Sequence, residues 1–169
     1  WQKVARVVIA PINDMDRPDN EAMLKLLKIQ LTPFNDIDPD TFNKKVLVDS
    51  QPSHQPRFAQ FQFDVIIDHH PSLPATKAAF KDIRPRYGAT ASMMTEYLKA
   101  AKIKPSRKLA TALFYAIKTD TNDFKRGAIQ KDVNAFQYLH PITNLTTIKK
   151  IEKTGLRGKY LRHFEKAFI

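Results

Sequence analysis

The sequence predicts an α/β fold with a parallel sheet flanked by helices on both faces. Short runs rich in Val, Leu and Ile, at 45–49 and 63–68, each close with an aspartate ahead of a proline-containing turn. Continuous apolar runs of this length are typical of buried strands. Longer segments with helical patterning alternate with them, and this alternation favours an α/β architecture with its chemistry beyond the carboxyl ends of the strands.

Local patterns predict the elements in order. We expect strands near 5–10, 45–49 and 63–68, and a further short strand near 79–83. We expect helices near 19–29, 88–101, 106–118 and 131–139. Asp19, Asn20 and Glu21 predict the N-cap and first turn of the first helix, where the helix dipole favours acidic side chains. Pro33 to Pro39 and Pro52 to Pro56 mark loops rather than domain boundaries.

Length and composition limit the class of protein. The 169 residues are 43% hydrophobic, which is enough for one substantial core and favours one domain. No apolar stretch approaches the roughly 20 residues of a membrane span, and we expect no cleavable leader and a cytoplasmic location. The absence of cysteine excludes disulfides and a cysteine nucleophile.

The charge balance points to an anionic partner. The net charge is +11, from 28 Lys and Arg against 17 Asp and Glu. A basic surface attracts polyanions and steers them to a site, so phosphorylated nucleotides or short oligonucleotides fit as substrates. Arg86 and Arg126 follow the loops described below, and we expect them to contact phosphate. The other basic residues are expected to be solvated surface.

Three apolar elements each end in a strong ligand. Asp49 and His69 follow two predicted strands, and Asp120 follows a predicted helix. Two carboxylates around an imidazole are costly unless a cation neutralises them. Such ligands suit Mn²⁺, Fe²⁺, Co²⁺ or Zn²⁺, and the lack of cysteine argues against a thiolate zinc site. Helix capping and turn formation explain each acid singly, but explain all three together less well.

The tripeptide Asp68-His69-His70 is the most informative feature of this pattern. Neighbouring side chains on a strand alternate between faces, so the two imidazoles are expected to have different roles. The alternative is a polar strand end whose histidines hydrogen-bond to loops.

Four segments in order resemble motifs of the DHH phosphoesterase superfamily. They lie at 46–52, 68–70, 87–98 and 117–124, and the third begins with Tyr87-Gly88-Ala89-Thr90, as in the oligoribonuclease and adenosine bisphosphate phosphatase-like branch. The resemblance covers roughly residues 5–140. It implies a DHH domain with a two-metal site, with Mn²⁺ as the expected ion and Mg²⁺, Co²⁺ or Fe²⁺ as alternatives.

The resemblance also assigns roles to residues. It implies that Asp49, His69 and Asp120 bind metal, that His70 faces the substrate phosphate, and that Asp68 orients an imidazole from behind. His70 and Asp68 are therefore the expected catalytic pair. The chain departs from the family in its first motif, a strand followed by one His and two Asp ligands, which is not found. The acids at 14, 16 and 19 have no accompanying histidine and fit a turn and a helix start.

The family's smaller second domain also has no counterpart. We therefore expect an N-terminally incomplete DHH domain over 1–145, a helical segment leading towards an interdomain linker over 146–169, and an inactive fragment when this chain stands alone. The resemblance implies an enzyme that hydrolyses phosphoesters in nucleotides or short oligonucleotides. Pyrophosphate, polyphosphate or cyclic-dinucleotide hydrolysis stays open, as do a non-catalytic basic module that binds nucleic acid and a homodimer.

Overall fold

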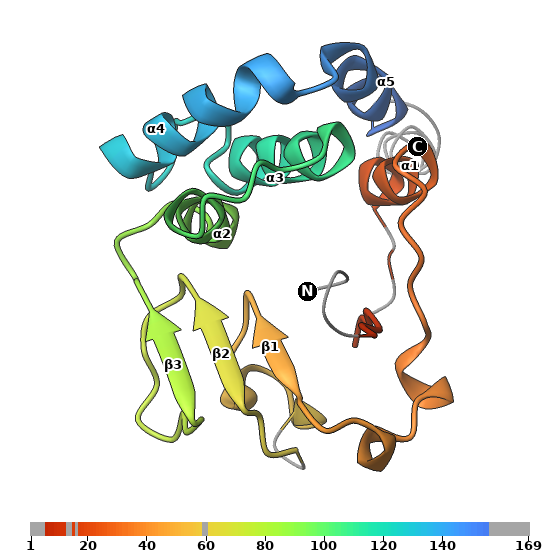
Figure 1. Cartoon of the computed structure of the whole chain (residues 1–169), viewed down its shortest axis with the longest axis vertical. Helices are drawn as coiled ribbons and strands as arrows, with labels where there is room; N and C mark the ends of the chain where they lie inside the picture. The colour runs from red at the N-terminus through yellow and green to blue at the C-terminus, as the bar shows by residue number, and fades with distance from the viewer. Residues whose placement is uncertain (1–5, 13–14, 16, 59–60, 156–169) are drawn as a thin grey trace, which may run out of the picture. The chain divides into compact units, whose positions relative to one another are not determined.

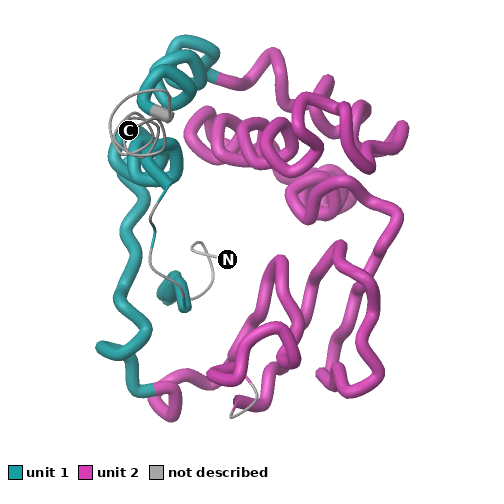
Figure 2. Tube along the Cα trace, turned by 180° about the vertical axis from the view of Figure 1, so that it is seen from behind, with its two compact units in different colours: residues 1–38, 144–169 teal, residues 39–143 magenta. Residues whose placement is uncertain are grey.

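The computed structural model describes residues 6–12, 15, 17–58 and 61–155. The chain forms two compact units, one of residues 39–143 and one of residues 1–38 with 144–169 (Figure 2). The helices expected over 156–169 lie outside the described residues. No helix in the described part of the chain is both long enough and apolar enough to span a bilayer.

A three-stranded parallel sheet lies in the unit of residues 39–143 and confirms the α/β class. Its strands are β1 (Val46–Val48), β2 (Val65–Asp68) and β3 (Phe80–Ile83), in the order β1-β2-β3 (Figure 1). The register pairs Leu47 with Ile66, and both are buried. Successive strand residues point to opposite faces, and Ile66 and Ile67 are both buried, so both faces of β2 are covered.

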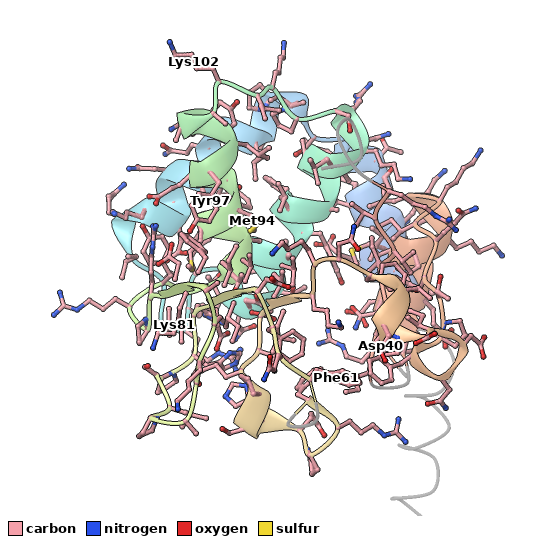
Figure 3. All side chains as sticks on the ribbon, turned by 60° about the horizontal axis from the view of Figure 1, so that its bottom comes forward. Asp40, Phe61, Lys81, Met94, Tyr97 and Lys102 are labelled. Carbon is pink, nitrogen blue, oxygen red and sulfur yellow. The ribbon has the colours of Figure 1, made fainter. Side chains whose placement is uncertain are left out.

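Three helices complete this unit: α2 (Thr90–Ala100), α3 (Arg107–Asp120) and α4 (Gln130–Leu139). Helix α2 lies above the ends to which the strands point (Figure 1). Its Met93 packs with Ile67 and Tyr87 in a buried cluster, to which Met94 and Tyr97 add on the same helix (Figure 3). Ser106 caps α3 by accepting a hydrogen bond from the Leu109 amide at 3.2 Å. These helices lie within two residues of their predicted positions.

Short 3₁₀ turns punctuate the connections. They are η1 (Phe34–Asp36), η2 (Pro39–Thr41), η3 (Pro52–His54) and η5 (His140–Ile142). Each of these turns contains a proline or directly follows one. Pro52 to Pro56 is a loop, as predicted. Pro33 to Pro39 is a loop too, but the boundary between the two compact units falls within it, after residue 38, so the prediction that it marks no boundary is wrong.

The unit of residues 1–38 and 144–169 contains α1 (Pro18–Leu26) and α5 (Leu145–Gly155), which pack against each other. The N-cap prediction at Asp19 is wrong. Arg17 occupies the N-cap and Pro18 the first turn, where its fixed φ suits a helix start. The Asp19 carboxylate is instead buried against the Arg17 guanidinium, with contacts of 3.2 and 2.6 Å.

The strand predicted over 5–10 is wrong for residues 6–10, which form no strand. Val7 and Ile9 keep 42% and 49% of their surface exposed, so this apolar run is not the buried strand that its composition resembles. The Ile9 carbonyl accepts its hydrogen bond from the Thr32 amide at 2.9 Å, which is a loop contact. An apolar pattern alone does not supply the neighbouring strand that a ladder requires.

Candidate metal and phosphate site

Asp49 lies immediately beyond β1, where its amide continues the ladder by donating to the Ile67 carbonyl at 2.9 Å. Its φ of 62° is in the left-handed region, which aspartate tolerates better than most residues. The Thr90 hydroxyl, in the first turn of α2, donates to Asp49 Oδ1 at 2.6 Å. This bond fixes a carboxylate that is 49% exposed.

His69 follows β2, and its proton position is set by a backbone carbonyl. Nδ1 lies 3.0 Å from the Tyr87 carbonyl oxygen, which can only accept, so Nδ1 carries the proton. In the neutral ring Nε2 then has a lone pair, and it lies 3.5 Å from Asp49 Oδ1. Two acceptors at this distance repel each other unless a proton or a cation lies between them.

Asp68 is fully buried at the end of β2 and holds the next imidazole. Its Oδ1 accepts from His70 Nδ1 at 2.8 Å and from the His69 amide at 2.9 Å. Burial alone would raise the pKa of Asp68, but hydrogen bonds from His70 and Gln51 outweigh it and lower that pKa. The ionised carboxylate therefore receives the Nδ1 proton of His70, whose side chain is 45% exposed.

Gln51 joins the turn after β1 to the turn after β2. Its side-chain nitrogen donates to Asp68 Oδ2 at 2.8 Å and to the Pro71 carbonyl at 2.9 Å. Its side-chain oxygen accepts from the Leu73 amide at 2.9 Å and from the Thr76 hydroxyl at 2.8 Å. All four hydrogen-bonding positions of this buried amide are used, so the two turns form one rigid assembly.

Asp120 is the last residue of α3, and its pKa is affected by charged groups of the same site. Burial is the main cause that raises the pKa of Asp120 to about 6; the nearby Asp49 carboxylate also raises it, whereas His69, His70 and Arg126 lower it. One oxygen or nitrogen each of Asp49, His69 and His70 lies within 4.8 Å of the others. Asp120 is outside this tighter cluster but close enough to be affected by it. The structure therefore brings two of the three predicted ligands, Asp49 and His69, together with His70, and the role of Asp120 as a ligand stays a prediction.

The two predicted phosphate-binding arginines differ in position. The Arg126 guanidinium donates to the backbone carbonyl of Asp120 at 2.9 Å, which places its charge beside the site. Arg86 is exposed in the connection between β3 and α2, two residues before Gly88. Its phosphate contact stays a prediction.

Gly88 explains how the start of α2 reaches the site. A Cβ at this position would lie 2.7 Å from Thr121 Cγ2 and 3.1 Å from the Ala128 Cα. The Gly88 amide donates to the buried Asp132 carboxylate at 2.9 Å. This close packing sets the positions of the Tyr87 carbonyl and the Thr90 hydroxyl.

Sequence reasoning missed three contributors to the site: Thr90, Gln51 and the Tyr87 carbonyl. Thr90 lies in the motif at 87–98, and this position is the only sequence signal for it, because its hydroxyl meets Asp49 only in the folded chain. Gln51 directly follows Asp49-Ser50 in another recognised motif. The carbonyl has no side-chain signature.

The donor set fits a divalent cation. Carboxylates and imidazoles suit Mn²⁺, Fe²⁺, Co²⁺ or Zn²⁺. His69 also shows the arrangement typical of metal-binding histidines, in which the other ring nitrogen donates to a carbonyl.

Comparisons with known proteins agree with this geometry. The model of the DHH family, N-terminal domain, matches residues 5–117, a range that includes Asp49 and 68–70 and ends just before Asp120. The uncharacterised protein MJ1633 of Methanocaldococcus jannaschii is 39% identical over 151 residues, covering 89% of this chain and 31% of that protein.

A solved structure is also similar. It is the crystal structure of a Methanococcus jannaschii protein assigned as a family II inorganic pyrophosphatase. It matches with a TM-score of 0.66 and 26% identity, covering 87% of this chain and 50% of that chain. The chain therefore spans less than a third of the curated relative's length and half of the solved one.

Proposed function

Because this chain belongs to the DHH family, we propose that its protein hydrolyses phosphoesters in a metal-dependent reaction. The metal site is formed by Asp49, His69 and Asp120, and His70 and Asp68 serve the substrate side. The pyrophosphatase-like structural match supports a phosphoryl-group hydrolase.

A single observation carries this proposal. The lone pair of His69 Nε2 faces an Asp49 carboxylate oxygen at 3.5 Å, and Asp120 is close enough for the Asp49 charge to add to the burial that raises its pKa. A structural histidine would turn a proton towards such a carboxylate. Here the Tyr87 carbonyl holds the proton on the opposite side of the ring. Unless the ring takes up a second proton, this arrangement is favourable only when a cation occupies the space between the ligands.

The roles of this chain's residues follow from their contacts. A bound divalent ion supplies Lewis-acid polarisation of the phosphoryl group and an activated water. Thr90 orients Asp49, and the Tyr87 carbonyl orients His69. Asp68 fixes His70 through Nδ1, so Nε2 is the atom that exchanges a proton with the leaving group or a phosphoryl oxygen.

For the substrate we propose short oligonucleotides or nucleotides. The net charge of +11 favours a polyanion, and Arg126 lies beside Asp120. Inorganic pyrophosphate is the second candidate, favoured by the structural match to the pyrophosphatase-assigned protein. We propose two Mn²⁺ ions as cofactor and the cytoplasm as location, and we leave a homodimer as a further prediction.

A substrate panel tests the proposal. The full-length protein is incubated with Mn²⁺ and a dinucleotide, adenosine 3′,5′-bisphosphate, a cyclic dinucleotide or pyrophosphate. We expect turnover of the dinucleotide or bisphosphate, and its loss in Asp49→Asn and Asp120→Asn. Preferred turnover of pyrophosphate would support the second candidate. No turnover of any of the four with Mn²⁺, Mg²⁺ or Co²⁺ would contradict an enzyme and favour a binding module.

A further inference from the structure

His54 lies beside the site but has no role in the reaction described above. It closes the 3₁₀ turn η3, and its ring centroid is 5.3 Å from that of His70, with the two planes at 81°. One ligand atom each of His54, Asp68 and His70 lies within 4.8 Å of the others. This group could serve as a second metal site or as an extension of the substrate site, and the hydrogen bonds distinguish the two.

The proton on His54 is placed by a backbone amide. The Gln51 N–H donates to His54 Nδ1 at 3.1 Å, so Nδ1 must hold a lone pair. The Ser50 hydroxyl also lies 3.1 Å from Nδ1. The neutral ring therefore carries its proton on Nε2, and Nε2 is the nitrogen left for an outside group.

This tautomer argues against a metal at His54. A metal bound through Nε2 needs the lone pair there, which would move the proton to Nδ1, where the Gln51 N–H already points. His70 has the opposite tautomer, because its Nδ1 proton goes to Asp68. The two neighbouring imidazoles thus offer complementary groups, an N–H donor from His54 and a lone pair from His70.

The segment that carries His54 is held in place. Gln51 is buried, and its side chain is bonded to Asp68 and to three groups in the turn after β2. His54 itself is exposed, so a ligand can reach its ring. A rigid, accessible donor is preorganised for binding and loses little freedom when it binds.

We propose that His54 is a substrate-contacting residue whose Nε2–H donates a hydrogen bond to a phosphoryl oxygen. This inference rests on the proposed function and extends the same site. A neutral donor binds a phosphoryl oxygen without competing for the metal. His54 would therefore contact the substrate, while the proposed metal ligands contact the ion.

Three variants of the full-length protein isolate the donor. His54→Gln keeps an acceptor for the Gln51 amide and an N–H donor, whereas His54→Ala has neither. His54→Met is uncharged, offers the Gln51 amide a weak sulfur acceptor and lacks the donor, and serves if His54→Ala does not fold. His140→Gln is the matched control, because His140 is exposed at the end of α4 and contacts Phe114.

The probes are Mn²⁺ alone and then inorganic phosphate added to the Mn²⁺-loaded protein, both followed by calorimetry. We expect His54→Ala and His54→Met to weaken phosphate binding about ten- to a hundredfold, the range for hydrogen bonds to charged groups. His54→Gln should stay within about threefold of the wild type by the same scale. Mn²⁺ affinity should be unchanged in His54→Ala and His54→Gln.

Two results would overturn the inference. One is unchanged phosphate binding in His54→Ala, or in His54→Met if His54→Ala does not fold. The other is weakened Mn²⁺ binding in both His54→Ala and His54→Gln. The second would make His54 a metal ligand. Phosphate binding needs no turnover, so loss of phosphate affinity in a protein that hydrolyses nothing would support His54 while contradicting the proposed function. Turnover with unchanged phosphate binding would do the reverse.

Discussion

At neutral pH and without metal, the ionised Asp120 side chain makes the protein less stable than an uncharged side chain at this position would. Burial and the Asp49 charge raise the pKa of Asp120 from 3.8 to about 6. Between these values the folded protein binds more protons than the unfolded chain, so stability falls as the pH rises from about 4 to 6 and is level above that range. Asp120→Asn removes the charge and keeps the shape, and should therefore stabilise the protein without metal.

The shift sets the size of the effect. The pKa values of Asp120 in the folded and unfolded states differ by about 2.2. This difference lowers the free energy of unfolding by about 3 kcal/mol at pH 8 and by only about 1 kcal/mol at pH 4.5. For the unfolding of a domain of about 150–250 residues, about 3 kcal/mol raises Tm by roughly 6–12 °C. The assay is unfolding of the full-length protein in a chelator, followed by circular dichroism at both pH values.

Asp123→Asn is the matched control in the same turn. Asp123 has a half-exposed side chain paired with Lys118 at 2.5 Å, and such surface pairs contribute only about 0–1 kcal/mol. We expect Asp123→Asn to change the free energy of unfolding little, and its difference from the wild type to be no larger at pH 8 than at pH 4.5. Added Mn²⁺ should reverse the order of Asp120→Asn and the wild type, because the ion favours the carboxylate. A gain in Asp120→Asn that is equal at both pH values, or absent at pH 8, would refute the reasoning.

Three further predictions concern the groups that support the site. Thr90→Val removes the hydroxyl that donates to Asp49 and should weaken Mn²⁺ binding about tenfold in a calorimetric titration, whereas Thr90→Ser should retain affinity; equal losses would contradict the hydrogen bond's role. Gln51→Leu leaves buried groups around Asp68 unpaired and should lower the free energy of unfolding by at least about 2 kcal/mol in urea; a neutral effect would show that Gln51 is not needed. Gly88→Ala places a methyl 2.7 Å from Thr121 and should destabilise by about 1–3 kcal/mol, more than Gly127→Ala, whose Cβ would meet nothing within 4 Å although its φ is +62°; the reverse order in thermal unfolding would contradict the packing.

The sheet was predictable because its signal is local. The runs at 45–49 and 63–68 become β1 and β2; β2 ends at Asp68, and β1 ends at Val48, one residue before Asp49. The run at 5–10 has the same composition, yet residues 6–10 form no strand. A ladder needs a partner far away in the chain, and composition does not report that partner.

The site was predictable in its acids and imidazoles but not in its supports. Asp49, His69 and Asp120 stood out because strong ligands at element ends are rare in an apolar context. Gln51 acts only because the fold joins two turns, and the Tyr87 carbonyl belongs to the backbone. The proton positions on His54 and His70 depend on such partners, so sequence could indicate that the histidines differ without assigning how.

The most direct test of the metal site is a Mn²⁺ titration of the full-length protein and matched variants by calorimetry. We expect Asp49→Asn, His69→Gln and Asp120→Asn each to weaken Mn²⁺ binding at least about tenfold, because each removes a proposed ligand. His140→Gln, an exposed histidine at the end of α4, should bind as the wild type does. Unchanged Mn²⁺ affinity in His69→Gln and Asp49→Asn would contradict the account, because it would show that the two facing acceptors do not share a cation.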